Sequence, residues 1–176
     1  MKGTRTLLSL AVGIAIASPS LHAASFSCPA DSLLTPIPVI QGSGNKSPLI
    51  PSDKFESPQS VMVKAVVSAL GESLNKGFYL QDVQGDGNPQ TSDGIFVYLN
   101  DKHFASKYPD IKPGAEVCLE AKVEEYYGHT QLKPLFDGST PRLTTLAQGA
   151  APAATALRVL EGETLARALE RHEGMR

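Results

Sequence analysis

Between residues 61 and 135 the sequence consists of short runs in which apolar and polar residues alternate, separated by turn-forming residues. Runs rich in β-branched and aromatic residues with this period are typical of an all-β domain. Alternate residues from Val61 to Val67 share one face of the first run, because successive side chains of a strand point to opposite sides. The pattern predicts five strands, at 61–67, 78–82, 95–99, 116–126 and 130–135.

The order of these runs favours a small closed barrel. Residues 101–108 can form one or two helical turns before Pro109 and Pro113 end them. Five strands with a helix between the third and fourth match the OB-fold, although composition alone also allows a β-sandwich or an SH3-like barrel. We therefore predict an all-β, five-stranded OB-fold-like barrel over residues 60–147. Its interior should hold Val63, Ala65, Phe78, Leu80, Ile95, Val97, Leu119, Ala121 and Leu132.

The segments outside the barrel have other compositions. Lys2 and Arg5, an apolar run at 7–17 and small residues up to Ala24 indicate a secretory signal peptide over residues 1–23. The apolar run is shorter than the roughly 20 residues of a membrane span. Several prolines and glycines in 24–59 predict an extended leader that lies on a surface. Residues 148–156 form an Ala/Pro linker, and 157–176 predict a strand at 157–160 and a helix at 163–172, the start of a second module that looks truncated.

Export would place both cysteines in an oxidising compartment, either the periplasm or the extracellular space, with no membrane attachment after cleavage. Cys118 has the outward parity of the fourth strand, where a leader crossing the barrel could meet it, so we predict a Cys28–Cys118 disulfide. Removing residues 1–23 takes away two of the 16 basic residues and none of the 18 acidic ones, which leaves a net charge of about −4. Nucleic-acid binding would therefore have to depend on a local patch.

Motifs for catalysis are not found in the sequence. Metal-dependent phosphodiester hydrolysis needs carboxylates and a histidine that converge on Mg²⁺ and a water, whereas His103, His129 and His172 are far apart along the chain. There is no Gly-x-Ser-x-Gly elbow, phosphate loop or dinucleotide fingerprint. We assign no catalytic residue, metal site or cofactor to this chain.

The acidic loop at 82–94 offers the one candidate for a metal site. Asp82, Asp86 and Asp93 carry oxygen ligands suited to Ca²⁺. Their spacing does not match the twelve-residue calcium loop, and Asp and Asn residues also form local turns. A hairpin loop closed by turn hydrogen bonds is the favoured interpretation.

Aromatic residues on the second and third strands suggest a binding surface. Tyr79, Phe96 and Tyr98 fall on the outward face, where OB-folds bind single strands by stacking bases on aromatic rings. Three lysines on other strands have the same outward parity and could meet the phosphates: Lys64, Lys122 and Lys133. The alternative is that the leader or another domain covers these aromatics. We expect weak binding of single-stranded nucleic acid.

Several blocks of the chain together resemble a known family. They include Ile40-Gln41-Gly42-Ser43-Gly44, Gly77-Phe78-Tyr79-Leu80-Gln81-Asp82 and Thr91-Ser92-Asp93-Gly94-Ile95-Phe96-Val97-Tyr98. Further blocks lie at 47–49, 85–87, 112–117, 127–132 and 169–175. Over residues 36–175 the chain resembles the OB-like region of secreted bacterial extracellular nucleases of the endonuclease/exonuclease/phosphatase type.

This resemblance implies a downstream catalytic domain that cleaves DNA or RNA phosphodiesters and binds the divalent metal itself. The present chain would then be a non-catalytic module that helps bind nucleic acid or orients that domain, either as a fragment of a longer nuclease or as a shortened relative. The alternative function is a free-standing periplasmic OB-fold protein that binds a small ligand or a partner.

Overall fold

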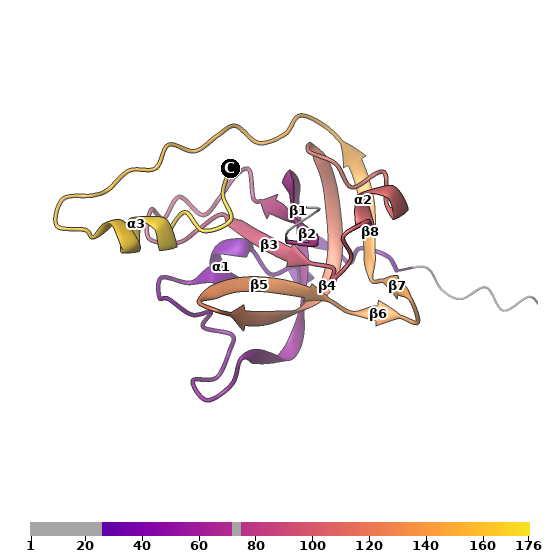
Figure 1. Ribbon diagram of the computed structural model, residues 1–176, viewed down its shortest axis with the longest axis horizontal. Helices are drawn as coiled ribbons and strands as arrows, with labels where there is room; N and C mark the ends of the chain where they lie inside the picture. Colours follow the sequence, from indigo (N-terminus) through magenta and orange to yellow (C-terminus); the bar gives the residue numbers. More distant parts are fainter. Residues whose placement is uncertain (1–25, 72–74) are drawn as a thin grey trace, which may run out of the picture.

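The structure is a computed structural model that describes residues 26–71 and 75–176 (Figure 1). The predicted signal peptide at 1–23 lies outside the described residues. Within the part that is described, no helix is long and apolar enough to span a membrane. The elements in chain order are η1 (Asp31–Leu33), α1 (Ile37–Gln41), β1 (Glu56–Gly71), β2 (Gly77–Gln81), β3 (Gly94–Tyr98), α2 (Phe104–Lys107), β4 (Ala115–Tyr126), β5 (His129–Pro134), β6 (Phe136–Asp137), β7 (Thr140–Pro141), β8 (Leu143–Gln148) and α3 (Leu165–Glu170).

Five strands close into a barrel with the order β1-β2-β3-β5-β4, and β4 returns to pair with β1. The β3–β5 pair is parallel and the other pairs are antiparallel. With α2 between β3 and β4, this is the OB-fold arrangement predicted from the sequence. The first half of β4 also pairs with β8, the strand that follows the barrel, and a small β6–β7 hairpin precedes β8.

The predicted register is confirmed, because all nine residues expected inside the barrel are buried. Val97, Leu80 and Ile95 are fully excluded from solvent. Phe104 of α2 joins them, with its ring centroid 5.9 Å from that of Phe78. The barrel interior is therefore filled by side chains from the five strands together with Phe104 of α2.

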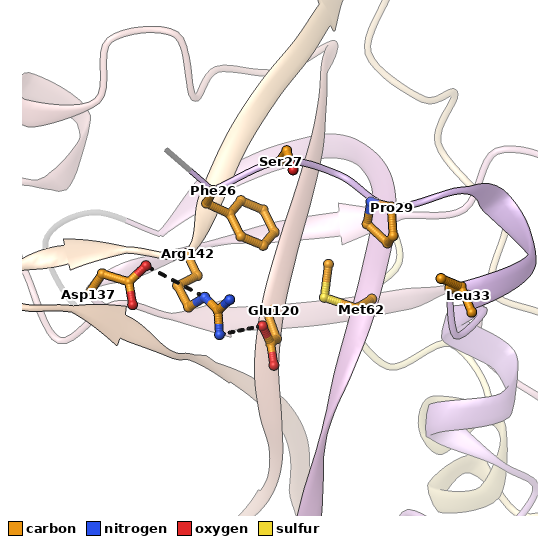
Figure 2. A pocket seen from close by; sticks show the side chains of 8 residues that line it. All are labelled: Phe26, Ser27, Pro29, Leu33, Met62, Glu120, Asp137 and Arg142. Atoms are coloured by element: carbon orange, nitrogen blue, oxygen red, sulfur yellow. Dashed lines mark ion pairs between the residues drawn. The ribbon is translucent and has the colours of Figure 1, made fainter. Parts of the chain in front are cut away.

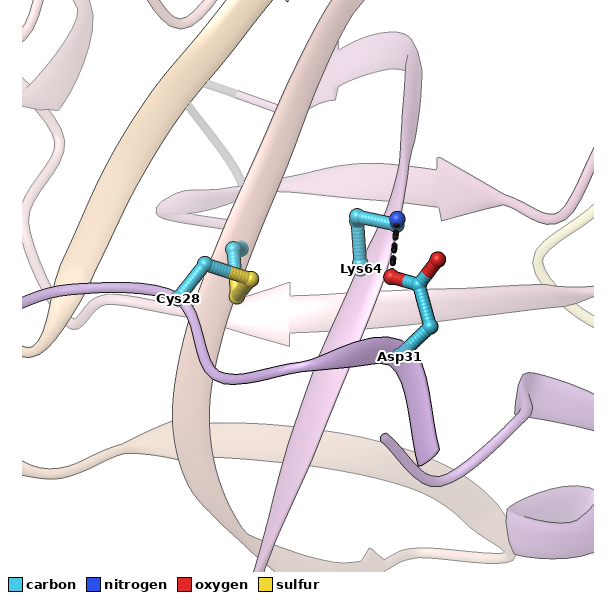
Figure 3. Close-up of a disulfide and its surroundings, with 4 residues drawn as sticks. Cys28, Asp31 and Lys64 are labelled. Carbon is cyan, nitrogen blue, oxygen red and sulfur yellow. Dashed lines mark hydrogen bonds and ion pairs between the residues drawn. A yellow bond between two sulfur atoms is a disulfide. The ribbon is translucent and has the colours of Figure 1, made fainter. Parts of the chain in front are cut away.

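Contrary to the prediction, the leader is not extended throughout: residues 26–36 lie on the outer surface of β1 and β4, and residues 37–55 form α1 followed by turns and bends. The predicted disulfide is present: Cys28 and Cys118 are joined, with their Cα atoms 5.7 Å apart (Figure 3). The leader also reaches deeper than predicted, because the short helix α1 places Ile37 and Ile40 in the core. Pro36 precedes this helix and Pro38 lies in its first turn, where the missing N–H groups cost little.

The C-terminal part differs from the prediction in one element. Residues 157–160 are not a strand: Leu157 and Val159 are about half exposed, and the Arg158 carbonyl accepts a hydrogen bond from the Arg171 guanidinium instead of a ladder bond. The predicted helix is present as α3, shorter than expected. Residues 149–164, between β8 and α3, are irregular. After α3 the chain returns to the barrel, as the yellow end of the ribbon in Figure 1 shows.

Candidate nucleic-acid interface

Tyr79 and Phe96 form an aromatic pair on the outer face of the barrel. They are cross-strand partners on β2 and β3, with ring centroids 4.9 Å apart and planes tilted by 51°. Both are partly exposed. Gly77 makes this placement feasible, because a Cβ there would lie 2.7 Å from the Phe96 ring. The result is an aromatic platform of the kind on which bases stack.

Tyr98 continues this face toward an open depression of about 590 Å³. Its hydroxyl donates a hydrogen bond of 2.8 Å to Asn100 Oδ1, which fixes the ring at the edge. Lys133 of β5 and Phe136 of β6 line the same depression, and Phe136 is 47 % exposed. Lys107 also lines it, and its ammonium group, bonded to Asp101, lowers the pKa of that carboxyl.

The three predicted lysines occupy two different places. Lys122 and Lys133 are cross-strand partners on β4 and β5, so they continue the face that begins with the aromatics. Lys64 lies beside the disulfide and donates to Asp31 of the leader at 2.6 Å (Figure 3). That contact raises the pKa of Lys64 and occupies its ammonium group.

The two lysines that remain on the face carry different amounts of free charge. Lys133 Nζ lies 3.7 Å from Glu56 and 3.5 Å from Glu124, so its charge is largely balanced. Lys122 Nζ donates to the main-chain carbonyls of Ser57 and Pro58, and over the described ranges no carboxylate comes within ion-pair distance of it. The face is therefore aromatic with a small positive component.

The acidic loop is held by local turn hydrogen bonds. Asp82 Oδ1 accepts from the Gln84 and Gly85 amides, and Asp86 Oδ1 accepts from the Asn88 amide at 2.8 Å. Burial, followed by the charges of Asp86 and Asp82, raises the pKa of Asp93. Across residues 26–71 and 75–176, no three His, Cys, Asp or Glu side chains are grouped so that they could hold a metal ion.

The three histidines are used in separate structural contacts. His103 precedes α2, and its amide donates to Asp101 Oδ1. His172 Nδ1 lies 2.7 Å from the Ala168 carbonyl, within the C-terminal tail. His129 contacts Glu173, 3.0 Å away. The structure does not bring these three side chains into one site.

A second depression, of about 390 Å³, lies between the leader and the outer surface of β1 and β4 (Figure 2). Arg142 crosses it, 2.7 Å from a Glu120 oxygen and 3.7 Å from an Asp137 oxygen. The Phe26 ring lies 5.8 Å from the guanidinium carbon. Because Glu120 and Asp137 balance its charge, Arg142 is better placed to hold the leader than to bind an anion.

Sequence reasoning missed two features next to the aromatic face. Phe136 follows the last barrel strand, and only the β6–β7 hairpin turns it toward Tyr98. Gly94 lies directly against the C-terminal tail, where an added Cβ would be 2.3 Å from Gly174. The sequence pattern places Gly94 at the end of the acidic loop, where turn formation already accounts for a glycine, so its close approach to the tail has no separate sequence signal.

The sequence matches no protein-family model and no curated protein. The resemblance to secreted nucleases therefore stays a prediction. The closed barrel, the aromatic face and the disulfide stand on the structure itself.

Proposed function

We propose that this chain is a non-catalytic OB-fold module of a secreted nuclease, and that it contacts single-stranded nucleic acid through the outer face of β2 and β3. The observation that carries the proposal is the partly exposed Tyr79–Phe96 pair, with Tyr98 beside it. OB-folds use this surface for oligonucleotides. The disulfide indicates an oxidising, non-cytosolic environment, which agrees with a secreted protein.

The energetics of this face favour weak binding. A stacked base contributes about 1–3 kcal/mol, and the face offers two or three aromatic positions. Association costs oppose this gain, as does the net charge of about −4 expected once residues 1–23 are removed. Lys122 and Lys133 can each neutralise one phosphate, provided that a phosphate displaces the carboxylates near Lys133. Under this proposal the module aids a nuclease by holding its substrate, and phosphodiester cleavage and its metal belong to a separate catalytic domain.

The test is a fluorescence-anisotropy titration of a short labelled single-stranded oligonucleotide. Loss of two stacked bases should weaken binding by the Tyr79→Ala/Tyr98→Ala variant at least about tenfold. The matched control is Phe55→Ala, because Phe55 is an exposed aromatic that precedes β1 and belongs to neither β2 nor β3. Equal affinities of wild type and the double variant would contradict the proposal. Cleavage of the oligonucleotide by the purified chain with Mg²⁺, Mn²⁺ or Ca²⁺ would contradict its non-catalytic part.

A further inference from the structure

The last residues of the chain, 173–176, cross the outer face of the barrel, and we call them the strap. Glu173 contacts His129 at the start of β5, and its carbonyl accepts a 2.6 Å hydrogen bond from Ser92 Oγ just before β3. The amide of Arg176 donates to Gln81 Oε1 at the end of β2, 3.0 Å away. The strap therefore spans three neighbouring strands.

The strap lies on the same face as the aromatic pair. Gln81 and Gly94 are cross-strand partners, each two residues from a member of the Tyr79–Phe96 pair. His129 is likewise two residues from Gln131, the β5 partner of Phe96. Residues two apart in a strand point to the same side and lie about 7 Å apart. The strap thus covers the row of side chains next to the aromatic row.

Contact at the centre of the strap is backbone against backbone. A Cβ added to Gly94 would lie 2.3 Å from the carbonyl carbon of Gly174 and from the Met175 nitrogen. A Cβ added to Gly174 would lie 2.7 Å from the Ile95 nitrogen, and Gly174 also has a positive φ of 71°. Both positions therefore need glycine for the strap to lie flat on β3.

Charge near the strap opposes this close contact. Glu173 has a 14 % exposed side chain, and its Oε2 atom is buried without a hydrogen-bond partner. Glu125 of β4 also has a buried, unpartnered oxygen, and its other oxygen accepts from Thr130. Burial and then the Glu170 charge raise the pKa of Glu173 to about 7, with a smaller increase from Glu125. His129 acts in the opposite direction, so the docked strap retains a repulsion that ionisation of Glu173 increases.

We propose that the strap masks part of the nucleic-acid-binding face, and that its release widens the surface available to a single strand. This inference depends on the proposed function, because it concerns the same face. Release exposes the buried side chains of Gln81 and Ser92, which can hydrogen-bond to bases or phosphates, and frees His129 from its contact with Glu173. It also removes the Glu173 carboxylate, which repels phosphates, from the edge of the aromatic row.

The experiment uses Gly94→Ala and Gly174→Ala in the full chain. Gly94→Ala changes a residue of β3, whereas Gly174→Ala leaves the barrel sequence intact. Gly174→Ala therefore still tests the inference if Gly94→Ala does not fold. Gly44→Ala is the matched control, since the nearest atom to its added Cβ is 3.7 Å away. Hydrogen–deuterium exchange of peptides covering 165–176 reports strap docking, and oligonucleotide anisotropy reports binding. In both strap variants we expect faster exchange and about 5- to 10-fold tighter oligonucleotide binding. A gain of that size corresponds to one additional contact between the oligonucleotide and the uncovered surface.

The outcomes separate this inference from the proposed function. Faster exchange with unchanged or weaker binding would overturn the masking role, while the aromatic face would stand if Tyr79→Ala still weakens binding. Unchanged exchange in both strap variants would show that the glycine contacts do not hold the strap, and would also overturn the inference. Absence of binding by wild type and by released variants alike would overturn the proposed function, and the inference with it.

Discussion

Removing the Cys28–Cys118 disulfide should destabilise the protein mainly through its unfolded state. The bridge spans a sequence separation of 90, and in the chain-entropy model a loop of that length is worth about 4.5 kcal/mol. The native leader keeps other anchors, because Ile37 and Ile40 remain in the core. A domain with a free energy of unfolding of about 5–15 kcal/mol would lose a large fraction of it and still fold.

The assay is urea denaturation followed by far-ultraviolet circular dichroism. A Cys28→Ala/Cys118→Ala variant should unfold at a urea concentration about 2 M lower than oxidised wild type, given an m value of about 2 kcal/mol/M. Reduced wild type is the internal control and should unfold close to the double variant. A loss below about 1 kcal/mol in both reduced wild type and variant would refute the reasoning, because it would mean that the bridge does not constrain the unfolded chain.

Three further predictions address the core, the strap and the binding face. Val97→Ala should lower the free energy of unfolding by about 2 kcal/mol in urea, because Val97 is fully buried and the change leaves a cavity; an unchanged midpoint would contradict the core assignment. The pKa of Glu173 is raised from 4.5 to about 7, so strap docking should be strongest below pH 4.5 and weaken as the pH rises through 7. Glu173→Gln should flatten that dependence in hydrogen exchange corrected for intrinsic rates, and an identical pH profile would contradict the assignment. The logarithm of oligonucleotide affinity should fall with the logarithm of salt concentration with a slope between about −1 and −2, since Lys122 and Lys133 serve the face; a slope beyond about −4 would point to a different surface.

The barrel could be predicted because its determinants are local. Alternation in the β1 and β4 runs sets which side chains face inward, and a shift by one residue would have exposed the whole apolar set. The alternation of side chains along β4 also placed Cys118 on the outer surface of the barrel, where the leader could reach it. The aromatic pair followed in the same way, because Tyr79 and Phe96 have outward parity on neighbouring strands.

Features that depend on long-range contacts could not be read from the sequence. Ile37 and Ile40 lie in a Pro-rich segment, and only a short helix turns both into the core. Lys64 has the expected parity, but Asp31, which is 33 residues away, holds it beside the disulfide. The strap depends on the meeting of Gly94 and Gly174, and neither glycine shows by itself that the other lies opposite.

The most direct measurement of the central claim is photo-crosslinking of a single-stranded oligonucleotide that carries a photoreactive pyrimidine, with the linked peptides identified by mass spectrometry. Stacking brings a base into van der Waals contact with the rings, so the account predicts cross-links on Tyr79, Phe96 or Tyr98, competed by unlabelled oligonucleotide. Cross-links confined to the leader or to the outer surface of β1 and β4, or no cross-link above an unrelated-protein control, would contradict it.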